Sequence, residues 1–258
     1  MHFITLTSDW GHASHEIAPV KARLLVAVPE AQVLDISHNV PPFNLSVAAQ
    51  LMSEAIEGFP AGSIHLVLVD TELAEHKRIL LAKYKYQFIV AADNGFLSLL
   101  GIEAPEILAW EGSPDFTKPF AEKELLIEAA VTLANKISDE LPGKPVSSIK
   151  TFTSEKPMVE DLKLTGKVIR IDAFGNLVIN IDKGTFEAAC KRRSFQLILR
   201  NHDRHDRIDR TYSDSRDEAG MFCIFNTAGL MEIGLYRDNA NKLLGMNVGN
   251  VVMIEFGS

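Results

Sequence analysis

The sequence has few cysteines, no excess of positive charge and no long apolar run, and each absence excludes a class of protein. Its two cysteines, Cys190 and Cys223, have no metal-ligand spacing and are expected to be small buried hydrophobes rather than a disulfide framework. A formal charge of -8 and a pI near 5.5 argue against a nucleic-acid partner, because the phosphate backbone is also negative. No apolar run approaches the roughly 20 residues of a membrane span, and the N-terminus lacks a signal-peptide pattern. We therefore expect a reduced, cytoplasmic protein with no membrane contact.

Several familiar cofactor and catalytic motifs are also missing. Residues 9–13, after the first expected strand, lack the paired glycines of a dinucleotide-binding loop, and the chain has no Gly-x-Ser-x-Gly nucleophile turn. Acidic and histidine side chains cluster twice, at Asp9, His12 and His15 and again at residues 202–206. We expect no metal site at either cluster, because zinc needs an enforced tetrahedral geometry and these residues fall in a loop and in a charged run.

What the sequence does contain is an alternation of strands and helices in its first 150 residues. Short apolar runs predict strands near residues 4–8, 31–36, 63–70, 78–82, 86–91 and 107–110, and helical spacing predicts helices at 17–28, 45–56 and 122–137. Strands that alternate with helices indicate an α/β domain with a mostly parallel sheet flanked by helices, over residues 1–150.

The pattern changes in the second part of the chain. Residues 151–164 are predicted to be a linker, and residues 165–258 a smaller all-β, barrel-like domain. Its short strands are expected near residues 167–172, 177–181, 195–199, 221–226, 230–236 and 251–256, with one helix at 183–189. The mixed-charge run at residues 200–218 is most simply a solvated loop.

Polar side chains follow three of the expected strands in the first domain. Asp9 ends the first strand, Asp70 ends the buried run at 63–70, and Asp93-Asn94-Gly95 ends another. Ligands of open α/β sheets bind beyond the carboxyl ends of the strands, where a carboxylate can accept hydrogen bonds from ligand hydroxyls. Taken alone, Ser8 or Asp9 fits the cap of the following helix better than a ligand site.

One dense polar turn lies in the second domain, at residues 171–177. Asp172 can bind an ammonium group, Phe174 can stack on a planar ring, and the Asn176 amide can pair with an adenine edge. Taken alone, this segment is better explained as a plain β-turn formed by Gly175 and Asn176.

Together with other segments, these motifs resemble one known family. In order along the chain, the segments are TLTSDWG (5–11), DISHNVPPF (35–43), FPAGSIH (59–65), ADNG (92–95), IDAFGNL (171–177) and FNTAGLMEI (225–233). The chain resembles the S-adenosylmethionine hydroxide adenosyltransferases, relatives of the fluorinase and chlorinase, over nearly its whole length. The resemblance implies an α/β N-terminal domain, a β-barrel C-terminal domain and a homotrimer. Each site would lie between the N-terminal domain of one subunit and the C-terminal domain of its neighbour.

The same resemblance gives roles to individual residues, with S-adenosylmethionine as substrate or ligand and no separate cofactor. The substrate-binding residues that it implies are Asp9 on the ribose hydroxyls, Phe43 on the nucleoside, Phe174 and Asn176 on adenine, and Asp172, Asn226 and Thr227 at the methionine end. These roles agree with the chemistry proposed above for each turn.

The implied reaction is attack of water on the ribose C5′ carbon, which releases methionine and adenosine. Water needs positioning and help with its proton, and the family uses an aspartate, an arginine and a histidine. In this sequence Asp70 stands at the aspartate position and Lys77, followed by Arg78, at the arginine position. Ala121 falls nearest the place of the histidine, for which His76 is a spatial candidate. Lysine keeps the charge but loses the planar fork of arginine.

Two functions are therefore open. The first is a metal-independent hydrolase of S-adenosylmethionine that uses Asp70 with Lys77 or Arg78 to orient water. The second is a binder of S-adenosylmethionine or adenosine that has lost the water-activating set. A halogenase is less well supported, because the sequence offers no defined halide pocket.

Overall fold

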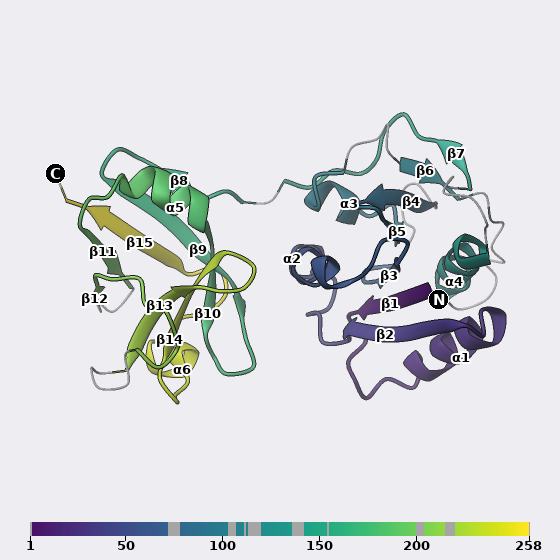
Figure 1. The fold of residues 1–258 in the computed structure, drawn as a ribbon, viewed down its shortest axis with the longest axis horizontal. Coiled ribbons are helices and arrows are strands. Elements are labelled where there is room, and N and C mark those ends of the chain that lie inside the picture. Colours follow the sequence, from purple (N-terminus) through teal and green to yellow (C-terminus); the bar gives the residue numbers. More distant parts are fainter. Residues whose placement is uncertain are drawn as a thin grey trace. The chain divides into compact units, whose positions relative to one another are not determined.

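The computed structural model describes residues 2–71, 78–102, 107–110, 112, 120–135, 142–153, 155–199, 204–214 and 220–257. The chain divides into two compact units, residues 1–154 and 155–258. Both are drawn in Figure 1.

The N-terminal unit is a twisted sheet between two layers of helices. In chain order its elements are β1 (His2–Ser8), α1 (Ile17–Ala27), β2 (Ala31–Ser37), α2 (Leu45–Ala55), a 3₁₀ turn (Ile56–Gly58), β3 (Ile64–Leu68), β4 (Ile79–Tyr84), β5 (Gln87–Ala92), α3 (Phe96–Leu99), β6 (Ile107–Ala109), α4 (Ala121–Asn135) and β7 (Lys144–Pro145). The strand order is β2-β1-β3-β5-β4-β6-β7. Strands β2, β1, β3 and β5 are parallel, and the remaining pairs are antiparallel. The mostly parallel sheet predicted from the sequence is confirmed.

Alternation along β1 explains the two layers. Ile4 and Leu6 face the core that contains α1 and α4, whereas buried residues of α2 and α3 form a second core on the other face of the sheet. Asn44 caps the N-terminus of α2, since its side chain accepts a hydrogen bond from the Val47 N–H at 3.0 Å. The carboxyl ends of β1 and β3, which run in parallel, therefore meet at one edge of the sheet, beside the start of α2.

The C-terminal unit is one antiparallel sheet that curls into a nearly closed barrel. Its elements are β8 (Met158–Val159), β9 (Lys163–Ile171), β10 (Leu177–Asp182), α5 (Lys183–Cys190), β11 (Phe195–Ile198), β12 (Arg204–His205), β13 (Met221–Phe225), β14 (Leu230–Leu235), α6 (Ala240–Leu243) and β15 (Val251–Phe256). The strand order is β12-β11-β15-β9-β10-β14-β13, with β8 on β9. The all-β prediction is confirmed, although it missed the short helix α6 and the two-residue strands β8 and β12. Cys190 and Cys223 are buried free thiols, as expected.

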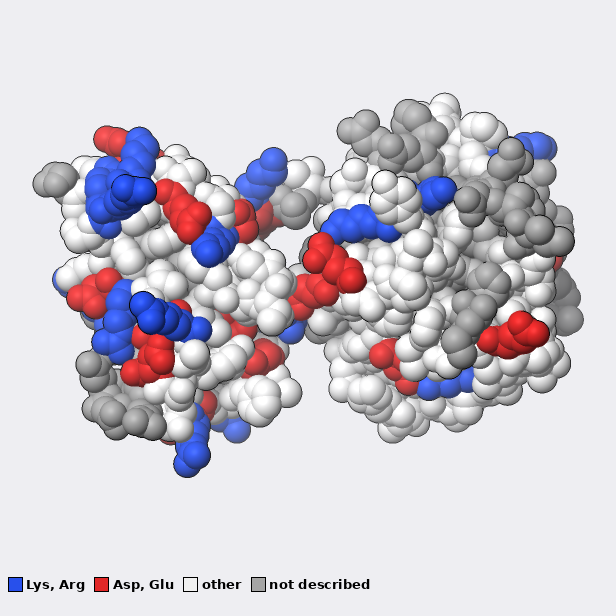
Figure 2. Space-filling model, in the orientation of Figure 1, with Lys and Arg blue, Asp and Glu red and all other residues white. Residues whose placement is uncertain are grey.

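Charged side chains do not dominate the face drawn in Figure 2, where small groups of Lys, Arg, Asp and Glu are separated by wide uncharged areas. None of the described helices has the length and apolar character needed to cross a membrane.

Candidate active site

The N-terminal site is built around the Asp9 carboxylate, at the end of β1. Asp9 Oδ2 accepts a hydrogen bond from the Phe43 N–H at 2.9 Å and a longer one from the Asp70 N–H at 3.4 Å. Asp9 does not cap the next helix, because α1 starts after Glu16 without a side-chain cap. The helix-cap alternative is therefore wrong, and one carboxylate ties together the ends of β1 and β3 and the start of α2.

Both backbone donors to Asp9 are in the left-handed conformation, which is uncommon for residues with a side chain. Phe43 has φ 62° and Asp70 has φ 46°. Asn94 stabilises the second of these, because its Nδ2 donates to the carbonyls of Val69 at 3.0 Å and Asp70 at 2.8 Å. The Asp70 backbone is thus held at both its N–H and its C=O. Such over-determined strain is typical of functional positions.

A pocket of about 370 Å³ opens beside this clamp. Its lining includes Phe43, Asp70, Leu99 and Phe152. Phe43 is 74% exposed, so its ring is available to a ligand. The Phe152 ring lies directly over Gly95, where an added Cβ would come within 2.2 Å of the ring, so only glycine permits this approach. Sequence analysis missed Phe152 because it lies in the segment that was assigned to the linker.

Of the two cations proposed to orient water, the structure describes Arg78 but not Lys77. Lys77 lies outside the described residues, as does His76. Arg78 donates from Nε to the Asp93 carboxylate at 2.7 Å and from its guanidinium to the Ser148 carbonyl at 2.5 Å. The Asp93 side chain is 1% exposed. Arg78 therefore already holds a buried ion pair and a crossing segment of the chain.

A Ser–His–Asp arrangement lies next to the clamp. Ser8 Oγ is 2.7 Å from His38 Nδ1, and His38 Nε2 is 3.0 Å from Asp35 Oδ1. Ser8 is 0% exposed, so its hydroxyl cannot reach a substrate. Burial raises the pKa of Asp35, but hydrogen bonds from Lys21 and His38 outweigh it and lower the pKa below its usual value. We assign the arrangement a structural role, because it fastens the end of β1 to the loop before α2.

The C-terminal site is the turn between β9 and β10. Asp172 Oδ1 accepts hydrogen bonds from the Phe174 N–H at 2.9 Å and the Asn176 N–H at 2.8 Å, and Oδ2 accepts one from Asn176 Nδ2 at 3.0 Å. Gly175 has φ 88°, and its N–H donates to the Asp172 carbonyl, so the predicted β-turn is present. Phe174 is nevertheless 78% exposed at its tip. The β-turn and an exposed aromatic ring therefore coexist in one segment.

A pocket of about 760 Å³ lies over this turn. The residues that line it are Asp172, Phe174, Asn176, Tyr212, Phe222, Leu235, Tyr236, Arg237, Asp238 and Asn239. The Tyr212 and Phe222 rings meet edge to face with centroids 5.2 Å apart. Aromatic walls with a few polar groups suit a planar, heteroatom-rich ligand such as a purine.

Asn226 joins the C-terminal site through Glu232, a residue that sequence analysis missed. Asn176 Nδ2 donates to Glu232 Oε1 at 3.1 Å, and Asn226 Nδ2 donates to Glu232 Oε2 at 3.3 Å. Burial and the charge of Asp172 raise the pKa of Glu232 above its usual value, against the opposing effect of these amides and the Tyr212 hydroxyl. Thr227 is exposed at the tip of the turn between β13 and β14.

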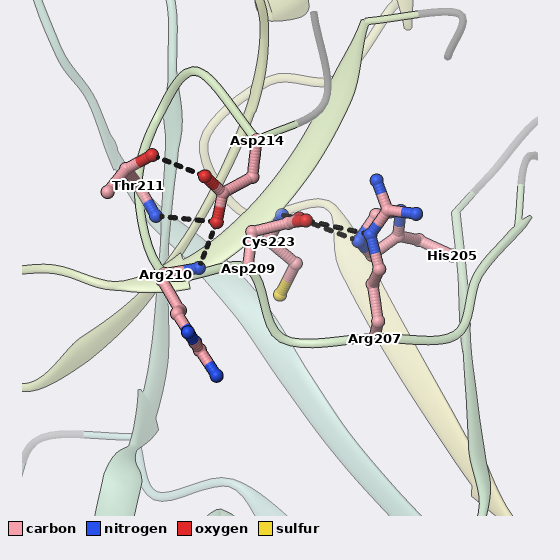
Figure 3. A network of polar contacts seen from close by, with 7 residues as sticks. All are labelled: His205, Arg207, Asp209, Arg210, Thr211, Asp214 and Cys223. Carbon is pink, nitrogen blue, oxygen red and sulfur yellow. Dashed lines mark hydrogen bonds and ion pairs between the residues drawn. The ribbon is translucent and has the colours of Figure 1, made fainter. Parts of the chain in front are cut away.

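The segment that carries Tyr212 is mostly exposed, but a buried aspartate fastens it to β13. Asp209 is buried and accepts hydrogen bonds from the Cys223 N–H at 2.9 Å, His205 Nε2 at 3.0 Å and Arg207 Nε at 2.8 Å (Figure 3). Burial and then the Asp209 charge raise the pKa of the Cys223 thiol, so it is inert. Most of the described residues of 204–214 are exposed, as expected of a solvated loop, but one buried carboxylate fastens the segment to β13.

The described residues contain no group of three or more potential metal ligands, although His202 and Asp203 of the second acidic and histidine cluster lie outside them.

Comparisons with known proteins identify the family of this chain. The family model for the SAM hydroxide adenosyltransferase N-terminal domain matches residues 4–141, and the model for the C-terminal domain matches residues 166–253. The chain belongs to the SAM hydroxide adenosyltransferase family. Asp9, Phe43 and Asp70 fall in the first matched domain, and Asp172, Phe174, Asn176, Asn226 and Thr227 fall in the second.

Curated relatives span most or nearly all of the chain. The (R)-S-adenosyl-L-methionine hydrolase of Methanocaldococcus jannaschii is 27% identical and covers 96% of this chain and 93% of its own length. The enzyme of the same name from Thermus thermophilus is 25% identical and covers 98% and 100%. A fluorinase of Nocardia brasiliensis is 23% identical over 71% of this chain and 72% of its own. Among solved structures, a conserved protein of Thermotoga maritima matches with TM-score 0.83 and 26% identity, over 98% of this chain and 99% of that one.

Proposed function

We propose that the protein hydrolyses S-adenosylmethionine to adenosine and L-methionine. Water attacks the ribose C5′ carbon, the C5′–S bond breaks with its electron pair going to sulfur, and the water loses a proton. The products are the adenosine 5′-hydroxyl, the methionine thioether and a proton. No metal or separate cofactor takes part in the proposed reaction.

The observation that carries this proposal is the carboxylate clamp at Asp9 in a chain of this family. One oxygen of Asp9 is occupied by backbone N–H groups, which leaves the other to accept from two adjacent ribose hydroxyls. Phe43 would pack on the nucleoside. Asp70, strained and next to the clamp, would orient the attacking water with Lys77.

In the C-terminal unit, Phe174 and Asn176 would receive adenine in the aromatic pocket. Asp172, Asn226 and Thr227 would hold the methionine end, because the α-ammonium group needs acceptors and the α-carboxylate needs donors. We further propose a homotrimer in which each site combines the N-terminal unit of one subunit with the C-terminal unit of its neighbour, in a cytoplasmic protein.

A second candidate function is binding without turnover. It is favoured by Arg78, whose guanidinium is already used by Asp93 and Ser148, and by the absence of a histidine from the sequence around Ala121. This leaves Lys77 as the cation on which the hydrolase depends.

One experiment distinguishes the two functions. The purified protein is incubated with S-adenosylmethionine, adenosine and methionine are followed by chromatography, and binding is measured in parallel by calorimetry. Equimolar release of both products supports the hydrolase. Binding without product supports the second function, and the absence of both refutes each of them.

Subunit mixing tests the proposed assembly. Asp9→Ala damages only the N-terminal site and Asn176→Ala only the C-terminal site. If the sites form between subunits, co-refolding the two inactive variants regains part of the activity, because some sites then combine two intact halves. If each site lies within one chain, the mixture stays inactive.

A further inference from the structure

Glu232 is a buried carboxylate whose partners are two amides and the Tyr212 hydroxyl. It lies in the middle of β14, between Val178 on β10 and Ile224 on β13, and it is 5% exposed. Its two oxygens accept from the amides of Asn176 and Asn226. Burying an ionised group without a cation is costly, so the fold retains Glu232 against a free-energy penalty. The proposed chemistry does not use it.

The contact with Glu232 fixes which way the Asn176 amide points. Asn176 Nδ2 has two hydrogens, and both are taken, one by Asp172 Oδ2 at 3.0 Å and the other by Glu232 Oε1 at 3.1 Å. Turning the amide over would place its oxygen against two carboxylates that can only accept. The asparagine therefore keeps Oδ1 as its one remaining polar atom.

Gly234 makes room for this orientation. A Cβ at Gly234 would lie 2.3 Å from Asn176 Oδ1 and 2.2 Å from the Phe222 ring. Asn176 and Phe222 both line the 760 Å³ pocket, together with Phe174 and Tyr212. The pocket thus combines aromatic walls with an asparagine that can accept but cannot donate.

We propose that Glu232 is a positioning residue that makes the pocket select 6-aminopurines over 6-oxopurines. A 6-amino group donates to Asn176 Oδ1, whereas a 6-oxo group places its oxygen, which is also an acceptor, against Asn176 Oδ1. A site built around such a bond rejects the mismatched ligand, because the buried polar groups are left unpaired. This inference rests on the proposed function, since it takes the C-terminal pocket to be the purine site.

The test is calorimetric binding of adenosine and inosine to the full chain and to Glu232→Gln. We expect the wild type to prefer adenosine by roughly ten- to hundred-fold, the ratio that one unpaired buried polar group gives. Glutamine has the same shape but can donate, so only Asp172 still opposes turning of the Asn176 amide, and the ratio of adenosine to inosine affinity should narrow several-fold. Glu255→Gln, the same change at an exposed position on β15, is the matched control and should leave the ratio unchanged.

Each outcome separates the inference from the function on which it rests. Adenosine binding with an unchanged ratio in Glu232→Gln overturns the inference and leaves the proposed function standing, as does wild-type binding of inosine as tight as that of adenosine. Binding of neither nucleoside overturns both. A merely structural role for Glu232 would weaken both ligands equally and keep the ratio.

A ligand series keeps the inference testable if Glu232→Gln does not fold. Purine riboside lacks a 6-substituent, so it neither donates to the asparagine oxygen nor opposes it with an acceptor. The wild type should bind adenosine best, purine riboside next and inosine worst. Inosine binding as tightly as purine riboside would mean that a donor faces the 6-position, which contradicts the fixed amide.

Discussion

In the N-terminal unit the candidate site is held by contacts between segments that are distant in the sequence, whereas in the C-terminal unit it is a local turn whose Asn176 amide is fixed by side chains. Asp9 accepts hydrogen bonds from the N–H groups of Phe43 and Asp70, which lie 34 and 61 positions further along the sequence. Asp172 accepts from its own turn, and a network of amides and a buried glutamate then fixes Asn176.

The difference shows how one aspartate can serve fold and ligand together. At both sites one carboxylate oxygen accepts two backbone N–H bonds. We propose the other oxygen of Asp9 for the ribose, and the other oxygen of Asp172 accepts from the Asn176 side chain. The N-terminal site forms only when distant segments meet, so it should respond sharply to any loss of the clamp. The C-terminal turn forms locally, but its specificity depends on the distant Glu232.

The largest expected effect is that of Asp9→Ala. It removes the ribose acceptor and releases two left-handed residues, so we expect nucleoside binding to fall at least about 100-fold, as for loss of charge-assisted bonds in a positioned site. Calorimetry with adenosine measures the loss. Unchanged affinity would mean that Asp9 does not hold the ribose.

Asp9→Asn separates the two roles of this residue. Its amide oxygen can still accept from the Phe43 N–H, while its NH₂ group replaces the ligand-facing acceptor. If the clamp is all that matters, Asp9→Asn binds like the wild type. If the ribose contact also matters, affinity lies between the wild type and Asp9→Ala.

Asp70→Asn should separate binding from chemistry. Asparagine tolerates the left-handed conformation, so the fold and the clamp are kept. We expect affinity for S-adenosylmethionine to change little and turnover to fall by about 10²–10⁴, the range for loss of a general acid–base group. Single-turnover kinetics beside calorimetry gives both numbers. Retained turnover would remove Asp70 from the chemistry.

Asp209→Ala should act on the C-terminal unit alone. It leaves the Cys223 N–H without its acceptor and removes the carboxylate that pairs with His205 and Arg207, which costs about 3 kcal/mol of unfolding free energy. Denaturant unfolding measures the loss, and Asp206→Asn, an exposed position on the same segment, is the control. Equal losses in the two variants would mean that the Asp209 network does not stabilise the unit.

The smallest expected effects concern the pH dependence of stability, which should have opposite signs in the two units. Burial lowers the pKa of His65, so the unfolded state binds the proton more tightly and the N-terminal unit loses stability as pH falls through about 6.5. Burial and Asp172 raise the pKa of Glu232, so the folded C-terminal unit binds the proton more tightly and loses stability as pH rises from about 4.5 through the folded pKa. His65→Gln and Glu232→Gln should each flatten one response. Responses of the same sign in both units would contradict the assignment.

Much of the fold could be predicted from the sequence, because its helices and strands follow from patterns of neighbouring residues. Asn44, directly before the helix expected at 45–56, caps α2, and β4 and β5 turn at Lys85 and Tyr86, where the strands expected at 78–82 and 86–91 meet. Alternation of strands and helices was sufficient for the layered N-terminal unit.

The contacts that build the sites could not be read in the same way. No local signal joins Asp9 to Asp70, since only the parallel pairing of β1 and β3 brings them together. Tyr212 and Asp209 were hidden in a run whose composition is that of a solvated loop. In the sequence Glu232 is an acidic residue between the apolar Met231 and Ile233, both of which are buried. Because side chains alternate between the two faces of a strand, this pattern favours an outward, exposed glutamate and so did not indicate a buried one.

Turnover in water labelled with oxygen-18 tests the central claim most directly. The protein is incubated with S-adenosylmethionine in the labelled water, and the adenosine and methionine are analysed by mass spectrometry. Attack of water at C5′ predicts one oxygen-18 atom in adenosine, none in methionine, and loss of both products in Asp70→Asn. Adenosine without the label, or tight binding with no adenosine at all, would contradict the hydrolase.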